Sequence, residues 1–359
     1  MTPRAIPNRD ATVADIARAA KVSKATAARA LGDYGPVSDA VRDRVLAAAA
    51  ELNYRPNALA KSMNTGKSNT IGVVIGDIEN PFFGQAMRGI SDVAKEAGFD
   101  VILSNSDEDV EAERSAVDVL LDKRVDGLIV APASSNDTAH LDAVHASGRP
   151  IVLLDRRADD SDLDAVTVDN RGAAGSLARI LLAAGHRRIA FISTLEAETQ
   201  YASGNRLSMS SVRDRVHGIV EALSEAGVAD PERYIRLDAR RLGIGNLVRS
   251  LVSGDEPATA IIGSDSLVAL GILRELRALG LEVPRDISVV AFDNPDWTSI
   301  TTPPLSVVAQ PIYELGAAAA RAVIARVERR AGADGSVVFP TEFIPRESIA
   351  APALASPAR

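Results

Sequence analysis

Apolar residues recur at helical spacing in the first part of the chain and as short continuous runs afterwards. Between residues 13 and 20 they follow the i, i+3, i+4, i+7 pattern of an amphipathic helix, and Thr12 with Asp15 predicts a capping box at its start. After a tight connection, Ser23 is placed to cap a second helix that runs to about Leu31. The pattern therefore opens with two short helices joined by a turn.

A third helix and a short fourth helix are predicted next. Gly35-Pro36 turns the chain, and Ser38 can cap the third helix. The buried face of that helix consists of Val41, Val45, Ala48, Ala49 and Leu52. Asn57 can cap a helix that ends at about Asn64. Because isolated helices shorter than ~12 residues are marginal in water, this one should form only when something packs against it.

The outer face of the second helix combines basic and very small side chains. Lys24, Ala25, Ala28 and Arg29 share one stripe, whereas Ala27 faces the expected core. Small residues permit close approach to the major groove of DNA, and Arg or Lys can donate to guanine O6 and N7. A helix-turn-helix DNA-binding head fits this pattern. An ordinary small helical bundle with a basic surface fits it equally well.

From residue 70 onwards, strand-like apolar runs alternate with helical stretches that stop at a glycine. The runs are TIGVVI, FDVILS, DGLIVA, PIVLLD, RIAFIS, YIRLD, TAIIG and ISVVAF. Strand, helix, glycine and strand in succession indicate right-handed βαβ units on a parallel sheet covered on both faces. So many strands exceed one comfortable sheet, and the fold class is therefore predicted to be α/β with two parallel sheets.

Charge is divided unevenly along the chain. Residues 1–70 carry 11 Lys and Arg against 6 Asp and Glu, a net of +5, while the remainder carries 29 against 42, a net of −13, giving −8 overall. Positive charge lies where phosphates would be met, and the acidic remainder would repel them. The chain has 359 residues and 46% apolar content, which allows several domains.

Several classes of protein are disfavoured. The sequence has no cysteine, no apolar run near the ~20 residues of a membrane span, and a polar N-terminus unlike a signal peptide, so a cytoplasmic location is expected. No GxSxG, HExxH, P-loop or GxGxxG motif is present, and the four histidines lack metal-ligand spacing, so we expect no enzyme, no metal and no cofactor. His186, between a helix and a strand, is expected at the surface or in a cap.

Ordered motifs link the two parts of the chain to one family. The head contains VADIARAAKVSKATAARAL and VRDRVLAAAAELNYRPNALAKSM, and the remainder contains NPFF, KRVDGLIV, LLDRR, GHRRIAFI, SDSLVALG, VPRDISVVAFDN and TPPLSVVAQP. In this order they closely resemble the lac-repressor (LacI/GalR) family of bacterial transcription regulators. The resemblance implies a hinge helix that is ordered when two subunits pair over the minor groove. It also implies two similar α/β lobes of periplasmic-binding-protein type with a ligand between them.

The resemblance also implies the domain limits. Residues 1–56 would form the helix-turn-helix head, and residues 57–69 the hinge helix and linker. The first lobe would comprise residues 70–169 with 308–331, and the second lobe residues 170–307 with 332–359. The chain would thus cross between the lobes near residues 169, 307 and 332.

Candidate DNA contacts follow from the helix faces and the family motif. They are Thr12, Ser23, Lys24, Ala25, Thr26, Arg29, Asn57, Ala60, Lys61 and Met63. The chain departs from the family at Ala28, where many members have serine, and at Gly32, where many have asparagine. Both of those side chains are associated with phosphate contact, so their absence should weaken positioning more than base reading. Met63 replaces the usual leucine that enters the minor groove, and methionine retains the apolar character needed there.

Candidate ligand contacts lie at the carboxyl ends of the predicted strands. They are Asn80, Phe82, Phe83, Asp155, Arg156, Arg213, Ser264, Asp265, Asp293 and Gln310. Carboxylates accept from adjacent hydroxyls, Arg and Asn donate to hydroxyl oxygens, and aromatic faces cover the C–H side of a sugar ring. The set is most similar to that of ribose and related sugar binders, although Ala239 stands where an aromatic residue is expected.

Some of these residues have structural alternatives. Asn80 and Asp293 could cap turns, Phe83 could belong to the core, and Arg157 competes with Arg156. Three functions were weighed: a ligand-controlled DNA-binding regulator, a transport-type solute receptor and a sugar-acting enzyme. The sequence favours the regulator, most simply a repressor, because the other two have no use for residues 12–64. Its partners would be operator DNA, a sugar-like effector and a second copy of the chain, since paired half-sites require a homodimer.

Overall fold

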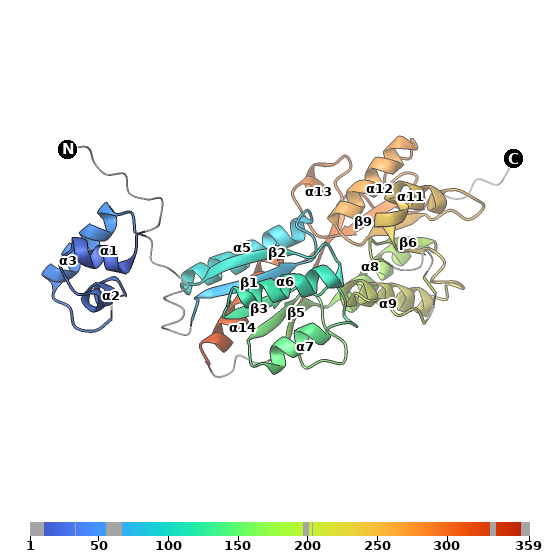
Figure 1. Cartoon of the computed structure of the whole chain (residues 1–359). Coiled ribbons are helices and arrows are strands. Elements are labelled where there is room, and N and C mark those ends of the chain that lie inside the picture. Colours follow the sequence, from blue (N-terminus) through green and yellow to red (C-terminus); the bar gives the residue numbers. More distant parts are fainter. Residues whose placement is uncertain are drawn as a thin grey trace. The chain divides into compact units, whose positions relative to one another are not determined.

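The structure is a computed structural model of the chain that describes residues 11–32, 34–54, 67–196, 201–202, 204–330 and 335–352. It divides after Ser68 into two compact units, which are described separately (Figure 1). The first is a small helical head, and the second is a larger α/β body. The predicted fold class, a helical head followed by an α/β body with two sheets, is confirmed.

Three short helices form the head. They are α1 (Val13–Ala19), α2 (Lys24–Gly32) and α3 (Asp39–Glu51). The predicted capping box is confirmed, since the Thr12 backbone N–H donates to the Asp15 carboxylate at 3.0 Å and the Asp15 N–H donates back to the Thr12 hydroxyl at 3.4 Å. Ser38 occupies the N-cap of α3, but its side chain makes no capping bond. The helices close over the fully buried side chains of Ile16, Ala27 and Val45.

The first lobe of the body is built on a six-stranded parallel sheet in the order β11-β5-β4-β3-β1-β2. Its strands are β1 (Thr70–Ile75), β2 (Asp100–Asn105), β3 (Gly127–Val130), β4 (Ile151–Leu154), β5 (Ala165–Val168) and β11 (Val337–Phe339). Its helices are α5 (Pro81–Glu96), α6 (Val110–Asp122), α7 (Ala139–Ala146) and α14 (Ile312–Val327). Helices α5 and α14 cover one face of the sheet, and α6 and α7 cover the other.

The second lobe repeats this plan with the order β12-β10-β9-β8-β6-β7. Its strands are β6 (Ile189–Ile192), β7 (Ile235–Arg236), β8 (Ala260–Gly263), β9 (Ser288–Phe292), β10 (Ser306–Ala309) and β12 (Glu342–Ile344). Its helices are α8 (Asn170–Ala183), α9 (Ser210–Glu225), α10 (Ala239–Leu242), α11 (Ile244–Val252), α12 (Ser266–Ala278) and α13 (Trp297–Ile300). The two predicted sheets are present, with one exception to parallel pairing, because β12 runs antiparallel to β10.

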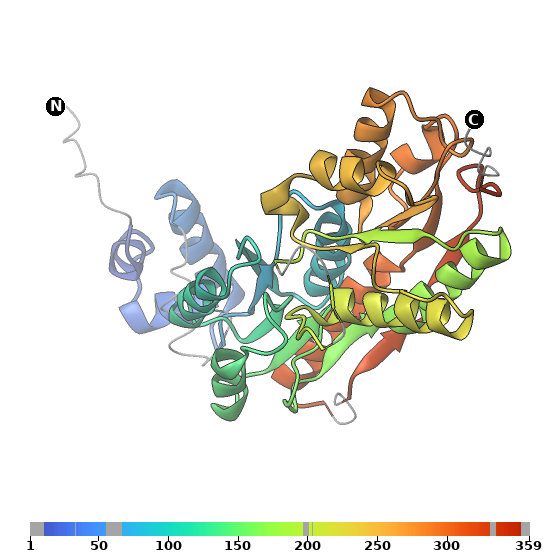
Figure 2. The same ribbon diagram turned by 90° about the vertical axis from the view of Figure 1, so that its right-hand side faces the viewer.

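The chain passes between the lobes at three places. It leaves the first sheet at Asp169, returns after β10 at Gln310, and crosses finally at Pro340, between β11 and β12. The predicted third crossover near residue 332 is therefore wrong, since β11 pairs with β5 in the first sheet. Residues 308–309, assigned in advance to the first lobe, end β10 in the second sheet. Figures 1 and 2 show the red-orange α14 among the cyan and green elements of the first lobe.

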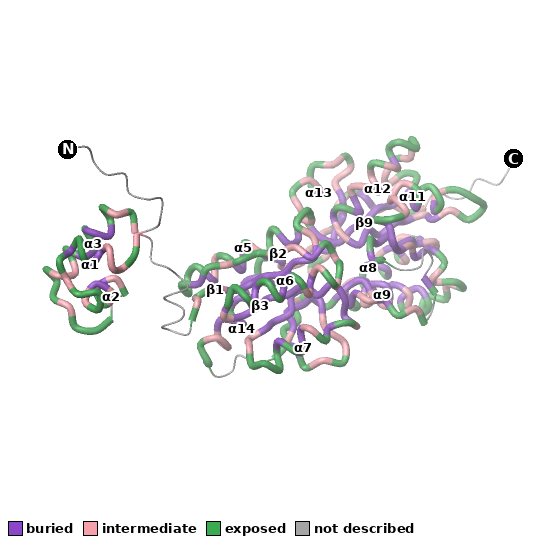
Figure 3. Tube along the Cα trace, in the orientation of Figure 1, coloured by how far each residue is buried: buried purple, intermediate pink, exposed green. Residues whose placement is uncertain are grey.

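Burial follows the strands. Figure 3 shows purple, buried chain along the sheets and green, exposed chain on the outer turns of the helices. Strands β3, β4, β6 and β8 are buried at every residue, as expected where helices cover both faces of a parallel sheet. Polar residues therefore come only after these strands end, and the candidate site lies at those ends.

Candidate functional site

Helix α2 exposes the basic stripe predicted from its sequence. Lys24, Ala25 and Arg29 are exposed, whereas Ala27 and Ala30 are buried against α1 and α3. Among the described residues, neither Lys24 nor Arg29 has an ion-pair or side-chain hydrogen-bond partner. The stripe therefore offers two unneutralised cations beside a methyl-sized neighbour, which suits close contact with a polyanion.

The hydroxyl groups predicted to contact DNA already serve the helix starts. The Thr12 hydroxyl donates to the Asp15 carboxylate at 2.6 Å. Ser23 Oγ accepts from the Thr26 N–H at 3.1 Å and lies 2.8 Å from Thr26 Oγ1. DNA contacts by these three residues stay predictions. The remaining candidates, Asn57, Ala60, Lys61 and Met63, lie outside the described residues.

A cavity of about 60 Å³ lies between the two lobes, at the carboxyl ends of their strands. Its lining includes the predicted residues Asn80, Phe82, Phe83, Asp155, Arg156, Ser264, Asp265, Asp293 and Gln310. Residues that were not predicted also line it: Glu108, Ser193, Thr194, Met209, Ser211, Val212 and Arg215. Ligand sites usually measure ~300–1,000 Å³, so the lobes must part to admit a ligand.

Arg156 is held by groups of its own lobe. It is buried, and it donates to both carboxylate oxygens of Glu108, at 2.5 and 2.8 Å, and to the Pro132 carbonyl at 3.0 Å. Burial opposes its charge, but Glu108 and Asp155 outweigh that effect and raise the pKa of Arg156. The same carboxylates fix the fork of the guanidinium toward the cleft.

The sequence did not identify Glu108 as a site residue, because its place in the cleft depends on an unusual backbone conformation. It lies in the acidic run before α6, which by sequence suits a loop and a helix start. In the structure Glu108 has φ +64°, a left-handed conformation, and turns its carboxylate back over Gly76. A Cβ at Gly76 would lie 2.4 Å from Glu108 Oε1, so only glycine leaves room for the carboxylate. Gly76, directly after strand β1, was the signal in the sequence for this close approach.

Arg213 does not line the cavity, and Arg215 takes the place that was predicted for it. Arg213 forms a bidentate pair with Asp159, with one contact of 2.7 Å. Arg215 donates to Asn170 Oδ1 at 2.7 Å and to the Ser264 carbonyl at 2.6 Å, and its guanidinium lies 3.9 Å from the centre of the Phe292 ring. Two residues along a helix correspond to about 200° of rotation, so the two arginines face opposite ways.

Carboxylates from both lobes are the main hydrogen-bond acceptors in the cleft. Asp293 accepts from the Gln310 amide at 2.7 Å, and burial raises its pKa to about 6. Asp265 caps α12 by accepting from the N–H groups of Leu267 and Val268, both at 2.9 Å. In the first lobe, burial raises the pKa of Asp155, while Arg156 opposes that rise. Together with Glu108, four carboxylates face two arginines that already have partners, so hydrogen-bond acceptors are in excess.

The aromatic wall comes from the first turn of α5. Phe82 and Phe83 are both buried and meet edge to face, with ring centroids 5.3 Å apart. Asn80 Oδ1 accepts from the Phe82 N–H at 3.0 Å. This oxygen therefore caps the start of α5, which is the structural alternative given for Asn80 above. Its amide nitrogen has no partner among the described residues and remains available as a donor. Ala239 is buried at the start of α10 and adds no aromatic face to the second lobe.

Direct contacts between the lobes flank the cavity. On one side, the Ser210 N–H donates to Ser135 Oγ at 2.9 Å, and the Arg157 N–H donates to Ser210 Oγ at 2.8 Å. On the other side, Arg240 of α10 donates to the Asp107 carbonyl at 3.0 Å and to the Asp77 carboxylate at 3.2 Å. These contacts hold the two lobes in a closed arrangement.

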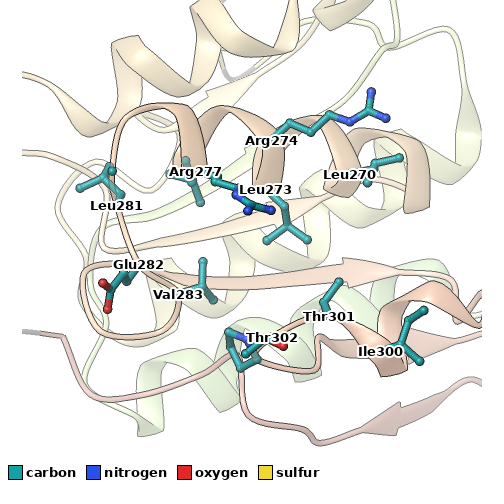
Figure 4. A pocket seen from close by; sticks show the side chains of 13 residues that line it. Leu270, Leu273, Arg274, Arg277, Leu281, Glu282, Val283, Ile300, Thr301 and Thr302 are labelled. Carbon is teal, nitrogen blue, oxygen red and sulfur yellow. The ribbon is translucent and has the colours of Figure 1, made fainter.

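The second lobe also has an open groove on its outer surface, between α12 and the segment after α13. Figure 4 shows Leu273 of α12 and Thr301 on facing walls, with Arg274, Arg277 and Glu282 at its edges. Ile300 at its rim is 80% exposed, the highest value among the large apolar side chains of the described residues. Apolar side chains thus line part of this groove, and Ile300 stands in solvent beside it.

No group of three or more His, Cys, Asp and Glu side chains within the described residues could hold a metal ion. None of the helices in the described part of the chain is long and apolar enough to cross a lipid bilayer.

Known proteins match both units of the chain. A family described as "Bacterial regulatory proteins, lacI family" matches residues 12–57, and one described as "Periplasmic binding proteins and sugar binding domain of LacI family" matches residues 68–347. Catabolite control protein A of Priestia megaterium is 34% identical over 330 residues, which cover 91% of this chain and 95% of that protein.

Solved structures match as well. The lac repressor dimer bound to operator and an anti-inducer superposes with a TM-score of 0.76 at 26% identity, covering 96% of this chain and 100% of the other. A LacI family transcriptional regulator from Enterococcus faecium with bound ribose has a TM-score of 0.67 at 28% identity, covering 79% of this chain and 99% of the other.

Proposed function

Because the chain belongs to the LacI family of bacterial regulatory proteins, it is a DNA-binding transcription regulator and not an enzyme, and we propose that a small hydroxyl-rich effector between its lobes controls its affinity for an operator. The most direct form of this proposal is a cytoplasmic repressor whose effector is an unphosphorylated sugar. The solute-receptor and enzyme alternatives are not favoured.

The observation that carries the choice of effector is the excess of acceptors in the cleft. Asp155 and Asp293 are buried at opposite walls, and Arg156 and Arg215 already bind protein carboxylate, amide or carbonyl oxygens. Adjacent hydroxyl groups of a sugar would donate to these carboxylates, and Phe82 would cover the C–H face of the ring. A phosphorylated sugar would bring further acceptors and negative charge to a site that has too many of both.

Support for a sugar also comes from the relatives. The Enterococcus faecium regulator is described with bound ribose, and a further structural match, at 26% identity, is described as a complex of the regulator CelR with cellobiose. The cleft of this chain has Ala239 where an aromatic residue was expected, so the aromatic cover of the sugar would come from Phe82 in the first lobe.

For DNA binding, we propose that α2 enters the major groove and that Arg29 reads a guanine there. The exposed guanidinium of Arg29, which has no ion-pair partner among the described residues, supports this role, as does the small Ala25 on the same stripe. Lys24 would contribute mainly through the phosphates. Two heads reading two half-sites would make the operator nearly palindromic.

The homodimer that this requires has a candidate surface in the groove between α12 and α13. A second copy of the chain is the occupant we propose, since the lac repressor match is described as a dimer on its operator. A two-fold interface sets each residue against its partner's equivalents, so Arg274 and Arg277 of one copy can face Glu282 of the other, around a centre that includes Ile300.

Coupling between the two sites would arise from lobe closure. Ligand binding would stabilise the closed arrangement that Arg240 and Ser210 already favour, and closure would change how the first lobes of two subunits meet. The coupling free energy need be only ~1 to 3 kcal/mol, and it must act equally in both directions.

The test uses the purified full-length protein. Selection from a random duplex pool should enrich a near-palindromic sequence, and a thermal-shift screen of pentoses, hexoses, disaccharides, polyols and purines should identify the effector. Each hit should then change the affinity for the selected duplex. A protein that enriched no sequence, with or without these compounds, would refute the proposal.

A further inference from the structure

The end of α2 is shaped by Gly32 and Tyr34. Gly32 follows Ala28 by four residues and Arg29 by three, so it continues the exposed basic stripe. A Cβ at Gly32 would lie 2.5 Å from Cε1 and 2.6 Å from Cδ1 of Tyr34. The tyrosine ring therefore occupies the space that a side chain at position 32 would need, and it lies on the same face as Arg29.

The chain after α2 holds the ring in this place. The Tyr34 N–H donates to the Arg29 carbonyl at 3.2 Å, a bond that spans five residues, one more than in an α-helix, as is common where a helix ends. Gly35 has φ +72°, and a Cβ there would lie 3.5 Å from Cδ of Arg29, so the turn brings the chain back beside the arginine stem. The turn after α2 thus brings Tyr34 and Arg29 close together.

The polar end of the ring is available to a ligand. Tyr34 is 54% exposed, and its hydroxyl has no hydrogen-bond partner among the described residues. Exposed tyrosine loses little conformational entropy on binding because only two side-chain torsions must be fixed. Here the Cδ1–Cε1 edge of the ring already lies against Gly32, which restricts the ring further.

We propose that Tyr34 is a DNA-positioning residue whose phenolic O–H donates to a phosphodiester oxygen at the edge of the groove that α2 enters. The inference rests on the proposed DNA-binding role of α2. The N-terminal residues of a recognition helix contact base edges, so a group beyond its C-terminal end meets the backbone. Tyrosine is among the neutral donors that contact phosphates, and it would supply a donor in the region where Ala28 and Gly32 have none.

The proposal makes Gly32 and Tyr34 a dependent pair. A side chain at position 32 would push the ring away from the stripe, so Gly32→Asn should lose the Tyr34 contact although asparagine is itself a donor. In a Tyr34→Ala background the same substitution has no ring to displace. The effects of the two substitutions should consequently be far from additive.

The first experiment compares wild-type protein and Tyr34→Phe on the duplex that the wild type selects. Phenylalanine keeps the ring and removes only the hydroxyl. Affinity should fall about tenfold or more, as expected for a hydrogen bond to a charged group, and by the same factor on duplexes with altered bases. The dependence on salt should keep its slope, because a neutral donor releases no counterion. Tyr313→Phe, which removes an exposed hydroxyl in the body, is the matched control and should bind as the wild type does.

The second experiment locates the phosphate. Duplexes with a methylphosphonate linkage at the same position of both half-sites, moved step by step along the operator, should include one position at which wild type and Tyr34→Phe bind equally well. Gly32→Asn should weaken operator binding in the wild-type background and should not weaken it in the Tyr34→Ala background.

The outcomes separate the two levels of the argument. Equal affinity of wild type and Tyr34→Phe on every duplex would overturn the role of Tyr34 and leave the regulator intact. A loss limited to one base pair would also overturn it, because that result assigns the hydroxyl to base reading. If wild type itself shows no sequence preference, the proposed function fails first.

Discussion

The basic side chains of the head and the arginines of the cleft are used in opposite ways. Lys24 and Arg29 extend from α2 with no ionic partner among the described residues, whereas Arg156 and Arg215 are buried and bound to protein oxygens before any ligand arrives. A cation left free can exchange water and counterions for a polyanion. A cation already neutralised instead fixes the shape of a pocket whose remaining acceptors select the ligand.

This difference makes the two sites respond differently to salt. Exposed charges are screened over a Debye length of ~8 Å at physiological ionic strength, and buried pairs are screened much less. Operator binding should therefore weaken steeply as salt rises, while effector binding should change little. Four substitutions test the contrast, and they follow in order of expected effect.

Arg156→Ala should have the largest effect, on stability. Removing the guanidinium leaves the carboxylates of Glu108 and Asp155 close together without their shared counter-ion, which should lower the free energy of unfolding of the body by about 3 to 5 kcal/mol. Urea unfolding measures this loss. Arg157→Ala is the neighbouring control, since Arg157 is 43% exposed in its pair with Asp214, and it should cost below about 1 kcal/mol. Equal losses in the two variants would end the distinction between buried and free arginines.

Asp293→Asn should act through pH. The pKa of Asp293 is raised from 3.8 in the unfolded chain to about 6 in the folded protein, so the folded state retains a proton that the unfolded state has lost. Stability of the wild type should thus fall as pH rises from about 4 to about 6, by roughly 3 kcal/mol at most. Asparagine has no such titration and tolerates the φ of +73° at this position.

The variant should therefore match the wild type near pH 4 and exceed it in stability above about pH 6, while binding the effector about tenfold or more weakly. Thermal unfolding across this pH range, with and without effector, measures both effects. Asp286→Asn is the control, because its hydrogen bonds with Arg285 lower the pKa of that exposed carboxyl. A gain in stability that was independent of pH would contradict the assignment.

Arg29→Ala should affect DNA binding and leave stability within about 0.5 kcal/mol, since its exposed guanidinium has no ion pair or hydrogen bond among the described residues. The loss should be about 1 to 3 kcal/mol at one half-site position, with relaxed preference at that base pair. Binding measurements on single-base variants of the operator give the result. A uniform loss on all duplexes would reduce Arg29 to a phosphate contact like Lys24.

Arg240→Ala should have the smallest effect. Its contacts with Asp77 and the Asp107 carbonyl cross the cleft at an exposed site, where ion pairs contribute about 0.2 to 1 kcal/mol. Losing them should favour the open lobes and weaken effector binding by at most about fivefold, measured by calorimetry at low salt. Arg241→Ala is the neighbouring control, because Arg241 pairs with Asp238 within its own lobe. A similar loss in that variant would show that Arg240 has no special role in closure.

Much of the fold could be predicted from local sequence patterns, namely helix caps and apolar runs. Thr12 and Asp15 specify the start of α1, and the apolar runs predicted strands β1 to β4 and β6 to β9. The short internal strands β5 and β10 were not among the predicted runs. The edge strand β11 escaped detection. Its residues Val337 and Val338 are exposed, so neither length nor periodicity separates it from a loop.

The site was predictable where residues directly follow strands, as Asp155 and Asp293 do. It was not predictable where the phase of a helix decides, as with Arg213 and Arg215, because a shift of two residues turns a side chain to the opposite face. Long-range packing was also hidden. His186, expected at the surface or in a cap, is 1% exposed and lies within hydrogen-bonding distance of Thr259 and Ser288, two residues far away in the sequence.

The three crossings between the lobes have one further consequence. Neither lobe is a continuous piece of chain, and each provides one wall of the cavity between them. Three short tethers hold those halves within reach of one another, so closure is an intramolecular reaction at high effective concentration. Once an effector binds to one wall, the other wall is therefore already close enough to close over it. A single backbone nick at any one tether would still leave the two lobes connected by the other two.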